Sequence, residues 1–257
     1  MILHQTIAGA GPRVLLLHPV GIDQIFLQPL AALLSPRYRV MCMDLRGHGH
    51  SPLLPLANGL DDFADDVHAT LVQERFAPCT VVGFSFGGMV AQTLALRYPA
   101  DVAALVPCAC PCTLTAENRV IAAARAADAE RDGMAAVLEA TLDRWFTPAF
   151  RNSGGDAAVR EHLLARDPRG WAQGWRAIAR IDNLPLLPTI RVPALCIAGE
   201  LDKSSPPQIV SAIASAIPGA GFKVIPGAPH MLLIEQPQAV ARELIAFLDG
   251  RDRDKRR

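Results

Sequence analysis

The chain has 257 residues, of which 51% are hydrophobic and 19% are charged. This composition is far too apolar for a disordered chain, and a chain of this length buries enough surface to fold without disulfides. The 25 Lys and Arg residues balance the 25 Asp and Glu residues, so the formal net charge is zero. Nucleic acid is therefore not an expected partner, because phosphate binding needs a positive field.

Short apolar runs predict strands at residues 13–18, 38–44, 79–84, 102–108, 192–198 and 222–225. Runs of this length suit strands that are buried on both faces, as in a parallel sheet. Helical patterns lie between them at 26–34, 59–75, 88–97, 206–216 and 237–248. This alternation predicts an α/β protein with a mostly parallel, doubly wound sheet.

One stretch interrupts the alternation and carries only helical patterns, at 116–130, 134–146, 156–166 and 168–181. We therefore expect an all-helical insertion at residues 113–185, over one edge of a sheet core made of residues 1–112 and 186–250. The charged residues 251–257 are expected to form a frayed, solvated tail.

Both the start of the chain and its cysteines bear on its location. Residues 1–6 lack the basic region of a secretory signal, and every apolar stretch is shorter than the about 18 residues that span a membrane. We expect a cytoplasmic protein with reduced thiols and no membrane partner. Cys108, Cys110 and Cys112 are separated by single residues, a spacing narrower than that of metal sites, so we expect buried thiols and no metal.

The sharpest motif is Gly83-Phe84-Ser85-Phe86-Gly87, which follows one predicted strand and leads into a predicted helix. In this context G-x-S-x-G is typical of a turn that exposes a serine nucleophile in a strained backbone conformation. Small residues two places on either side of Ser85 let the strand and the helix approach each other. The alternative is a tightly packed glycine-rich turn without chemistry.

A serine hydroxyl needs a base and an orienting acid, which follow it in the chain order Ser, Asp or Glu, His. His230 lies after the strand at 222–225 and is the one histidine in the C-terminal third of the sequence. Asp202 lies just past the strand at 192–198, with Glu200 as a competitor for the role of acid. The loop position favours Asp202.

An oxyanion hole needs two donors. The backbone N–H of Phe86, directly after the nucleophile, is one candidate. We assign the second to the N–H of Val20, because Pro19 has none to give. His18, in the same loop, is expected to brace the backbone.

Together these residues resemble the α/β-hydrolase superfamily, through His18-Pro-Val-Gly21, Asp44-Leu-Arg-Gly-His-Gly-His-Ser51, Gly83-Phe-Ser-Phe-Gly87, Gly199-Glu-Leu-Asp202 and Pro226-Gly-Ala-Pro-His230. The resemblance implies an α/β-hydrolase fold whose helical insertion is a cap over the active site. It also implies that Arg46, His48 and His50 belong to a scaffold loop.

Within the superfamily the chain looks most like 3-oxoadipate enol-lactonases and related small-ester hydrolases, through residues 18–23 and Leu142-Asp-Arg-Trp-Phe-Thr-Pro148. In those enzymes the cap segment places a tryptophan in the substrate pocket, so Trp145 is a candidate substrate-binding residue. Arg144 is a candidate partner for a substrate carboxylate, with a solvent-facing arginine as the alternative.

The sequence thus predicts a serine hydrolase of small esters or lactones that needs no cofactor and uses Ser85, His230 and Asp202. The alternatives are an acyltransferase or a carbon–carbon bond hydrolase with the same triad, and a non-catalytic small-molecule receptor of this fold. The expected partner is a small-molecule ester or lactone. The sequence shows no coiled-coil heptads and leaves open whether the protein forms a homo-oligomer.

Overall fold

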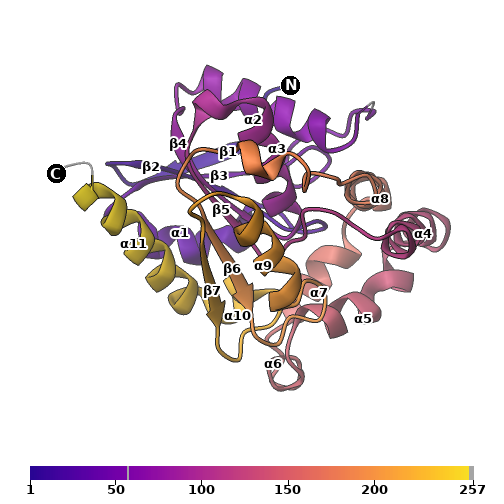
Figure 1. Cartoon of the computed structure of the whole chain (residues 1–257). Helices are drawn as coiled ribbons and strands as arrows, with labels where there is room; N and C mark the ends of the chain where they lie inside the picture. The colour runs from indigo at the N-terminus through magenta and orange to yellow at the C-terminus, as the bar shows by residue number, and fades with distance from the viewer. Residues whose placement is uncertain (57, 255–257) are drawn as a thin grey trace.

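The computed structural model describes residues 1–56 and 58–254, in which seven strands form one sheet in the order β1-β3-β2-β4-β5-β6-β7 (Figure 1). β1 is antiparallel to β3, and every other pair of neighbours is parallel. The strands are β1 (Gln5–Ala8), β2 (Arg13–Leu17), β3 (Arg39–Met43), β4 (Cys79–Phe84), β5 (Val102–Cys108), β6 (Leu195–Gly199) and β7 (Gly221–Ile225). The predicted fold class is confirmed.

Helices cover both faces of this sheet. The helices outside the insertion are α1 (Gln28–Leu34), α2 (Leu60–Gln73), α3 (Phe86–Arg97), α9 (Pro207–Ala216), α10 (Leu232–Glu235) and α11 (Pro237–Asp254). The buried side chains of α1 and α11 share a core with one face, and those of α2, α3 and α9 share a core with the other. In β2, Val14 and Leu16 join the first core while Leu15 and Leu17 join the second, which explains the continuous apolar run.

The chain leaves the sheet after β5 and returns to it at β6. Between them lie α4 (Ala116–Asp132), α5 (Met134–Trp145), α6 (Pro148–Asn152), α7 (Ala157–Leu164) and α8 (Pro168–Ile178), which gather beside the sheet and which we term the cap helices (Figure 1). The base of this insertion is closed by an antiparallel bridge between Thr113 and Asp182. The Asn183 N–H also donates to the Cys112 carbonyl oxygen at 2.8 Å.

Several short elements were not predicted from the sequence. β1 pairs at one edge of the sheet, and α6 and α10 are short helices. α11 continues to Asp254, beyond the point where we expected a frayed tail to begin, and the rest of that tail, residues 255–257, lies outside the described residues. None of the described helices is both long and apolar enough to cross a membrane.

Candidate active site

Ser85 occupies the sharp turn between β4 and α3, with a backbone φ of 51° and ψ of −113°. A positive φ is strained for a residue with a side chain, so the turn depends on the packing around it. A Cβ atom on Gly83 would lie 2.1 Å from the Gly87 carbonyl oxygen, and one on Gly87 would lie 2.4 Å from the Leu17 carbonyl oxygen. Glycine is therefore required at both positions that flank Ser85 in the motif.

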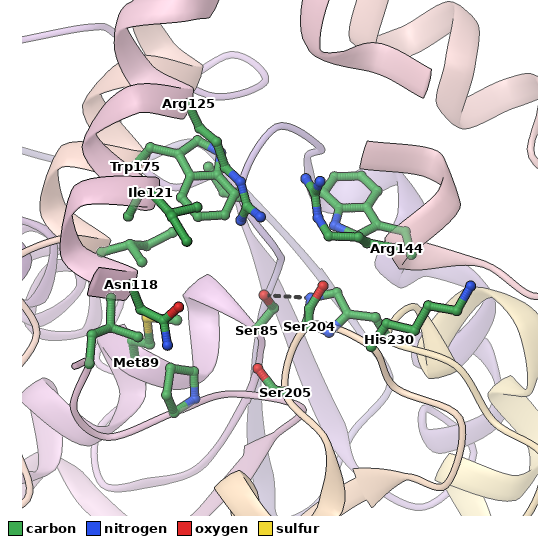
Figure 2. Close-up of a pocket in the computed structure, with 17 residues that line it drawn as sticks. Ser85, Met89, Asn118, Ile121, Arg125, Arg144, Trp175, Ser204, Ser205 and His230 are labelled. Carbon is green, nitrogen blue, oxygen red and sulfur yellow. Dashed lines mark hydrogen bonds between the residues drawn. The ribbon is translucent and has the colours of Figure 1, made fainter. Parts of the chain in front are cut away.

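Three side chains form a continuous hydrogen-bonded series at the carboxyl edge of the sheet. The Ser85 hydroxyl donates to His230 Nε2 at 2.9 Å (Figure 2), and His230 Nδ1 donates to the Asp202 carboxylate at 2.9 Å. These residues follow β4, β7 and β6, whose parallel alignment brings distant parts of the sequence together. Such a series can take the proton from the serine and stabilise the resulting imidazolium.

The surrounding loops distinguish Asp202 from its competitor. Asp202 Oδ1 accepts hydrogen bonds from the backbone N–H groups of Ser204 at 2.7 Å and Ser205 at 2.8 Å, which orient the carboxylate toward His230. Glu200 instead accepts a hydrogen bond from the Gly227 N–H at 2.7 Å. The structure thus pairs Asp202 with His230, while Glu200 braces the loop that precedes the histidine.

Val20 and Phe86 approach the serine from two different loops. Val20 lines the same cavity as Ser85, and Phe86 is the first residue of α3. Within residues 1–56 and 58–254, neither backbone N–H donates to a protein acceptor, whereas the Gly87 N–H donates to the His18 carbonyl oxygen at 3.1 Å. Two unpaired donors beside a serine, one of them at the start of a helix, can stabilise negative charge on a carbonyl oxygen.

His18 is held at both ring nitrogens. Its Nδ1 donates to the Pro19 carbonyl oxygen at 2.7 Å, and its Nε2 accepts from the Leu45 N–H at 2.9 Å. Burial lowers the pKa of His18 to about 4, so the ring is neutral near pH 7. The ring braces the loop that carries Val20 and has no nitrogen free for chemistry.

A cavity of about 200 Å³ opens onto Ser85 and His230 and is lined in part by the cap helices (Figure 2). Arg144 and Trp145, at the end of α5, both line this cavity. Trp145 is buried, and Arg144 is half-buried with its side chain directed into the cavity (Figure 2). Both candidate substrate-binding residues therefore lie near the serine.

The sequence of residues 14–243 matches the profile of the alpha/beta hydrolase family. The chain belongs to the alpha/beta hydrolase family. The sequence-based resemblance to this family is confirmed, and the hydrogen-bonded series and the cap helices lie within the matched residues.

Individual relatives of this hydrolase cover nearly all of its length. A pimeloyl-[acyl-carrier protein] methyl ester esterase of Chromobacterium violaceum is 30% identical over 251 residues, which are 94% of this chain and 96% of that protein. The crystal structure of the enol-lactonase from Burkholderia xenovorans LB400 has 31% sequence identity and a TM-score of 0.90, with 96% of each chain covered. The polyketide synthase ThaQ of Burkholderia thailandensis is 29% identical over 94% of this chain but only 12% of its own length.

The cavity of the hydrolase also contains residues that the sequence did not point to. α4 contributes Asn118, Ile121 and Arg125, and α8 contributes Trp175. Ala122, Ala126 and Ala129 form the buried side of α4 and recur at helical spacing. This spacing of alanines was the sequence pattern that could have indicated how α4, and with it Arg125, is oriented. It could not reveal which element α4 packs on.

All six cysteines of the hydrolase are buried and unpaired. Burial raises the pKa of Cys108 and Cys110 well above the usual range, so both are protonated thiols near pH 7. Cys110 packs against the first turn of α3, where a Cβ atom on Gly88 would lie 2.6 Å from its sulfur. The Cys110 thiol thus fills space beside the serine turn.

One cluster has the ligand types of a metal site, with donor atoms of His4, Asp44 and His50 within 4.8 Å of one another. Asp44 already accepts hydrogen bonds from the backbone N–H groups of Gln24 at 2.9 Å and His50 at 3.0 Å, and it contacts His4 Nδ1 at 2.8 Å. These bonds join the loops after β2 and β3. Asp44 therefore has a structural role in holding the scaffold loop.

Proposed function

We propose that this hydrolase cleaves small carboxylic esters or lactones through an acyl-enzyme on Ser85. The observation that carries the proposal is the hydrogen-bonded series from Ser85 through His230 to Asp202. Support also comes from relatives named as a methyl ester esterase and an enol-lactonase. Both of those names describe cleavage of a carbon–oxygen bond at an acyl group.

In the first step Ser85 Oγ bonds to the substrate carbonyl carbon while His230 Nε2 takes the hydroxyl proton. The N–H groups of Val20 and Phe86 stabilise the oxyanion, each by about 3 kcal/mol, as in other serine hydrolases. The carbon–oxygen bond then breaks, and His230 gives the proton to the leaving alkoxide. In a lactone, this alkoxide stays attached to the acyl group.

In the second step His230 takes a proton from water, and the hydroxide attacks the acyl carbon. The bond to Ser85 Oγ breaks, and the proton returns from His230 to the serine. Asp202 accepts the hydrogen bond from the Nδ1–H group throughout, so it keeps the imidazole in the tautomer that both steps need.

A fluorophosphonate probe tests the nucleophile directly, because it reacts only with an activated serine. We expect the wild type to be labelled once, at Ser85, and Ser85→Ala to lose both labelling and about 10⁴-fold or more of the ester hydrolysis. Ser204→Ala, in the same cavity, is the matched control and keeps its label. Failure to label the folded wild type would refute the proposal.

Product analysis then separates the reaction classes. With esters and lactones as substrates, the expected product is the free acid, with one oxygen atom from water. An ester of an added alcohol or a thioester of an added thiol, in place of the acid, would instead identify an acyltransferase. Cleavage of a diketone without ester hydrolysis would identify a carbon–carbon bond hydrolase.

A further inference from the structure

Two arginines of different cap helices extend into the cavity over Ser85. Arg125 comes from α4 and Arg144 from α5, and their guanidinium groups point into the same space from opposite walls (Figure 2). Both side chains are half-buried. Among the described residues, the lining of the cavity also includes Lys203 but no Asp or Glu.

Neither guanidinium has a carboxylate partner among the described residues. Arg125 stacks over the Trp175 ring, 4.5 Å from its centroid, and Arg144 Nη2 lies 3.4 Å from Thr141 Oγ1. Ion pairs with carboxylates hold five other arginines of this region, Arg131, Arg151, Arg160, Arg169 and Arg176. Arg119 instead donates to the carbonyl oxygens of Ala179 and Ile181. Arg125 and Arg144 thus reach the cavity with no carboxylate among the described residues to neutralise them.

The pair is electrostatically unfavourable without an anion. Burial and, to a smaller extent, the nearby positive charge of Arg144 together lower the pKa of Arg125 to about 10. Burial also lowers the pKa of Arg144. Both groups stay protonated near pH 7, so two like charges share a partly desolvated space. A bound anion would relieve this repulsion and supply the acceptors that the two guanidinium forks lack.

We propose that Arg125 and Arg144 jointly bind a carboxylate that the substrate carries in addition to its scissile group. The substrate class is then a monoester of a dicarboxylic acid, or a lactone that bears a carboxylate. This inference rests on the proposed function, since it assumes that the reacting carbonyl lies at Ser85. Trp175 has a positioning role, because its ring holds the Arg125 guanidinium in the cavity.

Paired esters of one acid test the inference. The monomethyl and dimethyl esters of succinic, glutaric and adipic acids differ in one negative charge, and kcat/KM is measured for each. We expect the wild type to prefer the monomethyl ester of at least one acid. Arg125→Met and Arg144→Met should each lower the ratio of kcat/KM for monoester over diester by about 10- to 100-fold, the range for a lost charge-assisted hydrogen bond. Arg125→Lys should keep part of the preference.

Arg131→Met is the matched control, because Arg131 lies on the same helix but at the surface, paired with Asp128 and Asp132. It should leave the monoester preference as in the wild type. A wild type that is labelled at Ser85 but shows no preference for monoesters would overturn the inference and leave the proposed function intact. The same holds if Arg125→Met keeps the preference.

Direct binding gives a readout that does not depend on turnover. Calorimetry with free glutarate and adipate is carried out on Ser85→Ala, with and without the added Arg125→Met change. We expect binding that weakens at least about 10-fold in the double variant. If no ester is cleaved and yet the dicarboxylate binds in this way, the proposed function fails while the anion site stands. Equal binding by both variants would refute the site.

Discussion

The backbone N–H of Met231 donates a hydrogen bond of 2.9 Å to the carbonyl oxygen of Trp145. Met231 follows His230, and Trp145 is the last residue of α5 and lines the cavity. A second connection lies beside the first, where Glu235 accepts from the Thr147 N–H at 3.2 Å and from the Thr147 hydroxyl at 2.5 Å. The end of a cap helix is therefore attached to the loop that carries the histidine.

Removal of the Glu235 carboxylate should weaken this attachment. Glu235→Ala leaves two donors of Thr147 without their acceptor, which we expect to cost about 1–3 kcal/mol in the free energy of unfolding. Glu235→Gln keeps one acceptor oxygen and should cost less. Urea denaturation measures both variants, and equal stability of Glu235→Ala and the wild type would contradict the prediction.

Gly174 of α8 should control the position of Val20. A Cβ atom at Gly174 would lie 2.6 Å from Val20 Cγ2, and Val20 is buried. We expect Gly174→Ala to displace the Val20 N–H and lower kcat about 10-fold, a fraction of the effect of losing one oxyanion donor. Val20 also lines the cavity, so KM is measured beside kcat, and a change in KM without a fall in kcat would contradict the prediction. Gly250→Ala, at a position with open space around it, is the control and should retain kcat.

Two buried histidines should make the protein less stable in acid. Burial lowers the pKa of His18 to about 4 and that of His48 to about 3, against an ordinary value of 6.5. Between these values the unfolded chain binds protons that the folded chain does not, so the free energy of unfolding falls as the pH decreases below 6.5. The expected slope is about 1.4 kcal/mol per pH unit for each histidine.

Urea denaturation of His48→Asn at several pH values checks this source of acid sensitivity. The variant should lose stability less steeply than the wild type between about pH 6 and pH 4, because it has one fewer proton-binding group in the unfolded chain. Comparison at about pH 8, where both histidines are neutral in both states, removes the effect of the changed packing. Parallel curves for the two proteins would show that His48 does not contribute.

The thiols should be unreactive while the protein is folded. Burial raises the pKa of Cys42, Cys79 and Cys196 to about 12, and all six cysteines are buried. An aromatic disulfide reagent at about pH 8 should therefore detect almost no thiol in the native protein, since the thiolate is the reactive form. All six should react after unfolding in guanidinium. Rapid reaction of one thiol in the native protein would identify an exposed cysteine.

Local patterns predicted the parts of this molecule that depend on local chemistry. The sharp turn at Ser85 was predictable because it needs glycines at fixed spacing. The positions of Asp202 and His230 at the same edge were predictable because both follow strands of a parallel sheet. Trp145 and Arg144 came only from a resemblance to known enzymes. The position of Arg125 in the cavity was not predicted, because it depends on which side of α4 faces the cavity. Packing of α4 against α8 and α5 determines that side. The edge strand β1 was too short to show a pattern.

The bridge between Thr113 and Asp182 suggests that the insertion can be replaced without disturbing the sheet. The two ends of the insertion meet at this bridge, so a short linker in place of residues 113–185 would leave β5 and β6 paired. We propose that residues 113–185 can be exchanged for the corresponding segment of a relative without loss of the sheet. Grafting the corresponding segment from a relative should transfer that relative's choice of substrate, while the recipient keeps its own nucleophile, base and acid.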